Sequence, residues 1–171
     1  PGTPLPCGID ITPDGGVWFA RLHSADIGRL DPATGAITMI ATPFTGPRRL
    51  RSDAEGNLWI GAFPESAIVR YEPRSGRFTR FDLPVLPKGS DTPYALNVDK
   101  KRGTVWVTGN QSDSLHALDI KSQAWRSVPL PRRVAFTRDI EIADDGTLFT
   151  STSHFPSWHV EDGQPTLIRL Q

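Results

Sequence analysis

Arginine and tyrosine side chains stand at corresponding points of a repeating pattern in this chain, where short apolar runs begin or end. The positions concerned are Arg21, Arg48, Tyr94 and Arg138. Guanidinium groups that converge on one cavity suit a carboxylate, sulfate or phosphate, because they donate charge-assisted hydrogen bonds in a planar fork. The alternative is structural: Arg48 and Arg138 would pair with acidic neighbours such as Asp139 or Glu141, or with carboxylates elsewhere in the protein.

A second group of side chains lies in the segment 151–165, which is longer than the corresponding connector 21–26 of the first repeat. It contains His154, Trp158 and His159. Two histidines followed by a pair of carboxylates could ligate a metal, but their spacing matches no established signature. We therefore predict no metal site here. The segment either contacts a ligand or partner, as long loops often do, or simply covers the fold.

The single cysteine, Cys7, excludes an internal disulfide and leaves the cellular compartment open. A nucleophilic role for Cys7 would need a paired histidine, and the sequence around it offers none. The isolated histidines, His23 and His116, are predicted to be surface or inter-strand residues. No catalytic residue is therefore predicted in this chain.

The element that must position these side chains is a repeat that occurs four times. Each copy has an apolar-polar run, an acidic-glycine turn and a strand centred on an aromatic residue. The copies are IDITPDGGVWFA (9–20), LRSDAEGNLWIG (50–61), LNVDKKRGTVWVT (96–108) and IEIADDGTLFTS (140–151). Their central aromatics are Trp18, Trp59, Trp106 and Phe149, and the turn glycines Gly15, Gly56, Gly103 and Gly146 keep the same increments. A period of 40–50 residues made of short strands is typical of a β-propeller.

We predict an all-β propeller of four blades, each a four-stranded antiparallel sheet. The blades are expected at about residues 7–43, 46–89, 92–132 and 134–171. The tryptophans are predicted to pack between neighbouring blades, with a ligand platform as the alternative. Residues 1–6 resemble the connectors between blades, and the last blade ends at its third strand, residues 166–170. We therefore expect the chain to be an incomplete ring, part of a larger propeller.

Composition limits the possible partners. The 19 basic and 19 acidic side chains cancel, so no overall field favours nucleic acid. With 37% hydrophobic residues, a mean hydropathy of −0.32 and no long apolar run, the chain is expected to be soluble, without a membrane span. The expected partners are a small molecule or peptide, another protein, or the remaining blades.

Four segments resemble the virginiamycin B lyase family, the streptogramin lyase-like propellers. They are PCGIDITPDGGVWFA, ADIGRLDPATG, GNLWIGA and SAIVRYEPRSG. The resemblance covers the first two blades well, the third fairly and the fourth only in its first half. It implies a seven-bladed ring and a lyase that opens a cyclic peptide antibiotic by elimination across an ester bond, with a bound magnesium ion.

The family's catalytic residues can be looked for position by position. A histidine in a PHGI-like phrase is matched here by Cys7, Arg48, Tyr94 and Arg138, and a glutamate in a WFTE-like phrase by Arg21, Ala62, Gly109 and Thr152. An arginine stays protonated, so it can neither abstract a proton nor bind magnesium. If the complete ring is a magnesium-dependent lyase, its catalytic residues are expected outside this segment.

Three hypotheses for function follow. The first is a lyase-like propeller whose chemistry resides on other blades. The second is a non-catalytic propeller that binds an anionic small molecule or peptide at the mouth of the channel. In that case Arg21, Arg48, Tyr94 and Arg138 would line the mouth, and the segment 151–165 would partly cover it. The third is an interaction subunit that docks another protein on its flat face.

Overall fold

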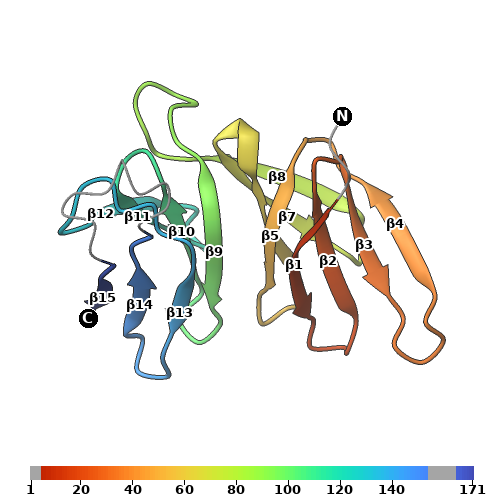
Figure 1. Cartoon of the computed structure of the whole chain (residues 1–171). Coiled ribbons are helices and arrows are strands. Elements are labelled where there is room, and N and C mark those ends of the chain that lie inside the picture. The colour runs from red at the N-terminus through yellow and green to blue at the C-terminus, as the bar shows by residue number, and fades with distance from the viewer. Residues whose placement is uncertain (1–4, 154–164) are drawn as a thin grey trace.

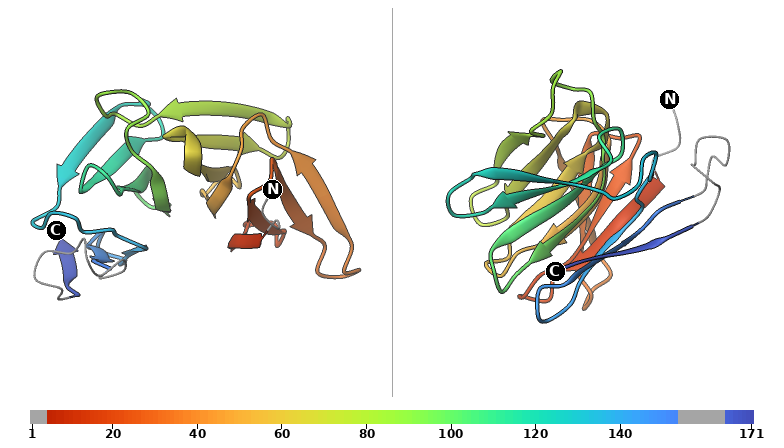
Figure 2. Two further views of the ribbon diagram at one scale, coloured as in Figure 1. Left: turned by 45° about the horizontal axis from the view of Figure 1, so that its top comes forward. Right: turned by 90° about the vertical axis from the view of Figure 1, so that its left-hand side faces the viewer.

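The computed structural model describes residues 5–153 and 165–171, and this part of the chain is built almost entirely of antiparallel sheet (Figure 1). Four sheets follow one another along an open arc, and the first strand of each lies on the concave side (Figure 2). The all-β propeller architecture predicted from the repeat is therefore confirmed. Among the described residues, no helix is long and apolar enough to cross a membrane.

The strands run through each sheet in chain order. The first sheet has β1 (Leu5–Ile11), β2 (Val17–Leu22), β3 (Asp26–Leu30) and β4 (Ile37–Ala41). The second has β5 (Pro47–Ser52), β6 (Leu58–Ala62), β7 (Ala67–Glu72) and β8 (Arg77–Asp82), with the short 3-10 helix η1 (Phe63–Glu65) after β6. The third has β9 (Pro93–Asp99), β10 (Thr104–Gly109), β11 (Ser114–Asp119) and β12 (Trp125–Pro129). The fourth has β13 (Ile140–Ile142), β14 (Leu148–Ser151) and β15 (Leu167–Leu170).

The repeated acidic-glycine phrase forms the turn between the first two strands of a sheet. In the second sheet, the Asp53 carboxylate accepts hydrogen bonds from the backbone amides of Glu55 and Asn57. Gly56 follows with a φ of 84°, which a residue with a Cβ rarely adopts. This requirement explains why the glycine keeps its place in every copy of the repeat.

The core lies between neighbouring sheets, and the repeated tryptophans are at its centre. Trp18 of the first sheet packs among buried residues of the second, including Leu50 and Tyr71. Trp59 lies in the same way between the second and third sheets, and its indole nitrogen donates to Asp53 at 3.0 Å. The prediction that the tryptophans join neighbouring blades is confirmed.

One local expectation is wrong. Residues 1–6 were expected to be a connector, but β1 already includes Leu5 and Pro6, and Pro6 pairs with Arg21. The second sheet does the same, with Pro47 opposite Ala62. Proline suits the start of such a strand because its missing N–H leaves no ladder hydrogen bond unmade there.

The first strand of each complete sheet carries an irregularity near its start. One extra residue stands between Pro6 and Gly8, another between Pro47 and Leu50, and a third in β9 opposite the stretch Val107–Gly109. Such β-bulges turn a side chain away from the regular alternation of a strand. They fall at Cys7, at Arg48–Arg49 and at Tyr94–Ala95.

Candidate functional site

The candidate site forms where three consecutive sheets meet, at the beginning of their first strands. The guanidinium of Arg48 lies over the ring of Tyr94, 3.7 Å from its centroid, and 4.9 Å from the centroid of Phe63. The guanidinium of Arg138 lies 4.5 Å from the centroid of the same tyrosine ring. Arg48 belongs to β5, Phe63 to η1, Tyr94 to β9, and Arg138 precedes β13. These ends of β5 and β9 lie near the top of Figure 1, beside η1.

Aromatic packing fixes the geometry of this cluster. The rings of Phe63 and Tyr94 meet edge to face, with centroids 5.9 Å apart and planes at 81°. A guanidinium over an aromatic ring is attracted by the negative face of the ring, by about 0.5–2 kcal/mol depending on how far it is desolvated. The tyrosine therefore holds two cations of neighbouring sheets close together, although like charges repel.

Arg48 carries a charge that the described residues do not neutralise. Burial lowers the pKa of its guanidinium, and the nearby cations Arg49 and Arg138 lower it further, while Tyr94 and Cys7 act in the opposite direction. No ion pair joins Arg48 to a carboxylate among the described residues, and its buried Nε has no hydrogen-bond partner there. An arginine remains charged under these conditions. Arg48 therefore brings to the cluster a positive charge that no described carboxylate pairs with.

Asp139, one of the acidic neighbours considered as a structural partner of Arg48, pairs with a different arginine. Asp139 lies 3.9 Å from Arg49, between a carboxylate oxygen and Nη2. Arg49 also donates a hydrogen bond from Nη1 to the backbone carbonyl of Cys7, at 3.2 Å. Asp139 thus supports Arg49 and the first strand of the neighbouring sheet, rather than Arg48.

The other predicted site residues have separate positions. Arg21 forms a two-point ion pair with Asp26 of its own sheet, with Nε 2.8 Å from Oδ1 and Nη2 3.0 Å from Oδ2. No described contact joins Arg21 to Arg48 or Tyr94. The sequence analysis placed Arg21 in the same candidate site as these residues, and the described contacts do not support that grouping. The remaining predicted residues, His154, Trp158 and His159, lie outside the described residues.

Phe63 is the site residue that the sequence analysis missed. It starts η1 in the connector between β6 and β7, and Pro64 follows it at the beginning of this helical turn. The corresponding connector of the first sheet, residues 23–25, has no helical turn. The signal available in the sequence was the FPE phrase directly after the second strand.

His116 is buried rather than exposed. Only 1% of its surface is accessible, and its Nδ1 lies 2.8 Å from Ser127 Oγ. Its Nε2 lies 3.3 Å from the buried carboxylate of Asp91. The surface alternative for His116 is wrong and the inter-strand alternative is confirmed, because Ser127 lies opposite it on the next strand. His23 is exposed, as predicted.

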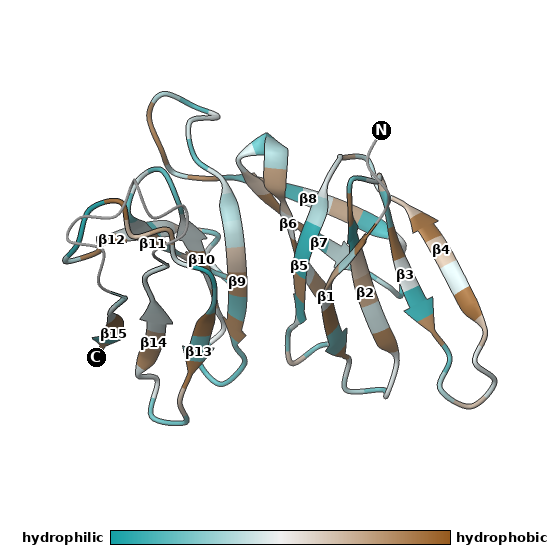
Figure 3. Cartoon of the chain, viewed as in Figure 1, coloured by the Kyte–Doolittle hydropathy of each residue, from teal (hydrophilic) through white to brown (hydrophobic). Residues whose placement is uncertain are grey.

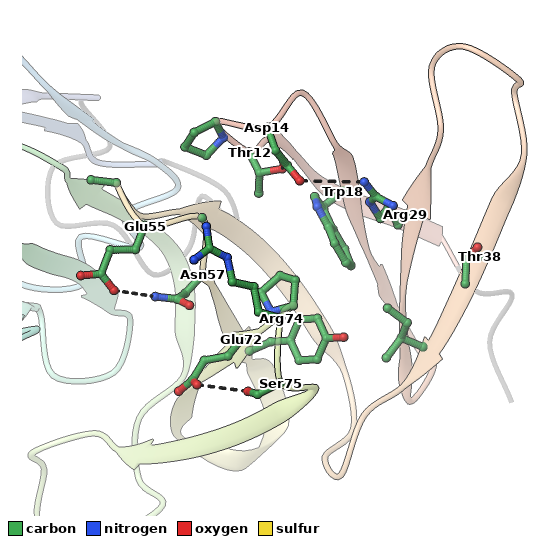
Figure 4. A pocket seen from close by; sticks show the side chains of 16 residues that line it. Thr12, Asp14, Trp18, Arg29, Thr38, Glu55, Asn57, Glu72, Arg74 and Ser75 are labelled. Carbon is green, nitrogen blue, oxygen red and sulfur yellow. Dashed lines mark hydrogen bonds and ion pairs between the residues drawn. The ribbon is translucent and has the colours of Figure 1, made fainter.

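A cavity of about 840 Å³ lies between the first two sheets, near the turns at the end of the sheets opposite to the Arg48 cluster (Figure 4). Its polar side chains bind one another: Arg29 lies 3.9 Å from Asp14, and Ser75 donates to Glu72. This partial self-neutralisation makes it a weaker candidate for a charged ligand than the Arg48 cluster. Within the described ranges, no three histidine, cysteine, aspartate or glutamate side chains gather as a metal site would require.

Known structures share this fold over nearly the whole chain. A streptogramin B lyase structure is 22% identical, with a TM-score of 0.76, over 96% of this chain and 54% of that one. Virginiamycin B lyase from Staphylococcus aureus is 19% identical, with a TM-score of 0.75, over 96% of this chain and 55% of that one. Kuenenia stuttgartiensis hydrazine synthase is 17% identical, with a TM-score of 0.77, over 98% of this chain and 50% of that one.

These TM-scores show a common fold, and the chain spans about half the length of the structures that it matches. The search of curated proteins found no match. The sequence model of the virginiamycin B lyase family matches residues 3–155, which is most of the 171 residues. The chain therefore belongs to the virginiamycin B lyase family.

Proposed function

We propose that this chain is the part of a larger propeller that binds an anionic group of a small molecule or peptide, where Arg48, Tyr94 and Arg138 meet. The observation that carries the proposal is the half-buried guanidinium of Arg48, which stacks on Tyr94 and has no carboxylate partner among the described residues. Stacking leaves the edge of a guanidinium free to donate, and this edge is the part that a carboxylate or phosphate binds.

The charge arrangement supports an anion in preference to a neutral ligand. The Arg48 and Arg138 guanidiniums both lie against the ring of Tyr94, so an anion between them would relieve their mutual repulsion. The phenol of Tyr94 can add a neutral hydrogen bond. Hydrogen bonds to charged groups contribute about 1.5–3 kcal/mol each, which is roughly tenfold or more in affinity.

A second candidate is lyase activity of the complete protein, and family membership favours it. Elimination requires a base, and a magnesium ion requires oxygen ligands. The positions that match the family's histidine hold Cys7, Arg48, Tyr94 and Arg138 in this chain. On this proposal the present sheets would orient an anionic or carbonyl group of the substrate, while further blades would supply the base and the magnesium ligands.

Calorimetric titration tests the anion site. Acetate, phosphate and a short peptide with a free carboxylate would be titrated into wild type, Arg48→Ala and Arg48→Lys proteins. We expect the alanine variant to bind at least one anion roughly tenfold more weakly or worse. The lysine variant keeps the charge but loses the planar fork and the ring stacking, so it should restore only part of the affinity.

Arg74→Ala is the matched control, because Arg74 is an exposed arginine at the opposite end of the second sheet. It removes the same net charge without touching the cluster. Equal affinity in wild type and Arg48→Ala, or an equal loss in Arg74→Ala, would contradict specific binding at this site.

A further inference from the structure

A pocket of about 590 Å³ lies between connectors of the first two sheets, and we call it the connector pocket. Leu22 lines it from the end of β2, and Phe63 and Pro64 line it from η1. Gly46, directly before β5, is a further lining residue, and the lining as a whole is mainly apolar. Phe63 therefore belongs both to this pocket and to the cluster around Arg48.

Backbone hydrogen bonds tie the walls of the connector pocket to one another. The amide of Gly46 donates to the carbonyl of Ser24 at 2.9 Å, and the amide of Phe63 donates to the carbonyl of Gly46 at 3.1 Å. Gly46 has a φ of 62°, and a Cβ at this position would lie 2.6 Å from Cδ of Pro64, so only glycine permits the close approach. The pocket is therefore formed before any ligand arrives, which reduces the cost of ordering on binding.

A carboxylate fixes η1, which lies between the pocket and the Arg48 cluster. Glu65 accepts hydrogen bonds from the amide of Thr45 at 2.7 Å and from its hydroxyl at 3.0 Å. The same side chain forms an ion pair with Arg80 of β8. These contacts hold η1 against the connector that leads into β5, so Phe63 has a fixed position relative to both neighbouring features.

The pocket and the candidate anion site are close enough for one ligand to reach both. Arg48 follows Gly46 by two residues, so their Cα atoms lie no more than about 7 Å apart. Figure 3 shows β5 as mostly hydrophilic, because three of its six residues are arginines, whereas the pocket lining beside it is mainly apolar. A small inorganic anion at Arg48 would leave that apolar lining in contact with water.

Building on the anion site proposed above, we propose that its ligand carries a large apolar group next to the anionic group, and that this apolar group enters the connector pocket. A peptide whose last residue is leucine or phenylalanine has this chemistry. Its carboxylate would bind the guanidinium edge of Arg48, and its last side chain would be removed from water in the pocket. The cluster then supplies charge recognition, and the pocket selects among anions by their apolar part.

Three probes separate the two contributions in calorimetric titrations of the 171-residue chain. They are acetate, N-acetylphenylalanine and the neutral N-acetylphenylalanine amide. Wild type should bind N-acetylphenylalanine at least about tenfold more tightly than acetate, because the pocket takes the ring out of water. The amide should bind at least about tenfold more weakly than the acid, because it lacks the charge that Arg48 recognises.

Ala25→Phe fills the pocket without changing the cluster, because Ala25 is an exposed lining residue in the connector between β2 and β3. It should reduce the affinity for N-acetylphenylalanine to about that for acetate and leave acetate binding unchanged. Ala33→Phe is the matched control, since Ala33 is exposed in the turn between β3 and β4 and outside the pocket lining. It should bind all three probes like wild type, and circular dichroism would show that both variants are folded.

The outcomes distinguish this proposal from the anion site on which it is built. Equal affinities of wild type for acetate and N-acetylphenylalanine, both weakened in Arg48→Ala, would overturn the apolar subsite and leave the anion site in place. Full affinity of Ala25→Phe for N-acetylphenylalanine would also overturn it, because the ring would then lie elsewhere. Affinities for both acids that are unchanged in Arg48→Ala would overturn the anion site itself.

Discussion

At the scale of single residues, Arg48 is held in place by an aromatic ring and is not neutralised by a described carboxylate. A surface arginine usually meets a carboxylate, as Arg21 does with Asp26. Arg48 is held instead by the ring of Tyr94, so its position is fixed while its hydrogen-bonding edge keeps its capacity. This difference distinguishes two arginines that the sequence placed in the same candidate site.

The buried carboxylate of Asp91 should make stability depend on pH in the acid range. Burial raises the pKa of this carboxyl, but hydrogen bonds from His116, Ser112 and the backbone amides of Gln111 and Thr92 outweigh it, so the pKa lies below its usual value. A carboxyl with a lowered folded-state pKa adds stability above its unfolded pKa of about 3.9. That contribution is lost as the pH falls through the folded pKa, below about 4.

Denaturant unfolding of wild type and Asp91→Asn between pH 2.5 and 6 measures this effect. The variant should be less stable at pH 6, by about 1–3 kcal/mol, and should lose less stability on acidification. Asp144→Asn provides the control, because Asp144 also has a lowered pKa but is an exposed partner of Lys101. An acid dependence as steep in Asp91→Asn as in wild type would contradict the assignment.

The sequence predicted part of the residue-level arrangement. Arg48, Tyr94 and Arg138 occupy one position of the repeat, so their convergence followed from the period alone. Phe63 and the pairing of His116 with Asp91 did not follow, because both depend on connectors whose lengths differ between repeats. The repeat predicts the positions that its copies share, and it does not predict contacts made by connectors that differ between the copies.

At the scale of elements, the bulge at the start of the inner strand β9 has its own stabilising contact. In the third sheet, the fully buried hydroxyl of Thr108 accepts a hydrogen bond from the backbone amide of Ala95, at 3.0 Å. Thr150 makes a related contact in the fourth sheet, where its hydroxyl donates to the carbonyl of Asp139 at 2.7 Å. These hydroxyls satisfy backbone groups that the interrupted ladder leaves without strand partners.

Replacing Thr108 with valine should therefore destabilise the protein although the side-chain volume is kept. The amide of Ala95 would be left buried without an acceptor, at a cost of about 1–3 kcal/mol. Urea unfolding measures the loss. Thr38→Val is the control, because Thr38 is exposed on the outer strand β4, and this change should be nearly neutral. Equal stabilities of the two variants would show that the hydroxyl of Thr108 does not support the bulge.

The strands that carry the repeated aromatic residues were predicted more accurately than the start of the first strand. The repeat placed a strand around each central aromatic residue, and β2, β6, β10 and β14 contain Trp18, Trp59, Trp106 and Phe149. Residues 1–6 were expected to be a connector, yet β1 begins at Leu5 and continues through Pro6 and Gly8, two residue types that often interrupt strands. The bulge accommodates both, and a bulge has no signature in a pattern of alternating polarity.

At the scale of the whole molecule, the described sheets form an arc, and the chain spans about half the length of the structures that it matches. We predict that the 171-residue chain alone does not open a type B streptogramin in the presence of magnesium. The reason is the replacement of the family's histidine and glutamate at all four equivalent positions. Mass analysis of the antibiotic after incubation measures the linear product. Turnover that a chelator abolishes would place a catalytic site within these sheets.

On the proposed anion site, the bulges would separate the residues of recognition from those of folding. Buried side chains such as Trp18 and Leu50 hold neighbouring sheets together, whereas the bulges carry residues that differ in size, charge and polarity at corresponding places: Cys7, Arg48 and Tyr94. A substitution at one of these positions would alter the proposed site in one sheet and leave the packing between sheets in place. The ligand preference of such an arc could therefore differ from one sheet to the next while the architecture stays the same.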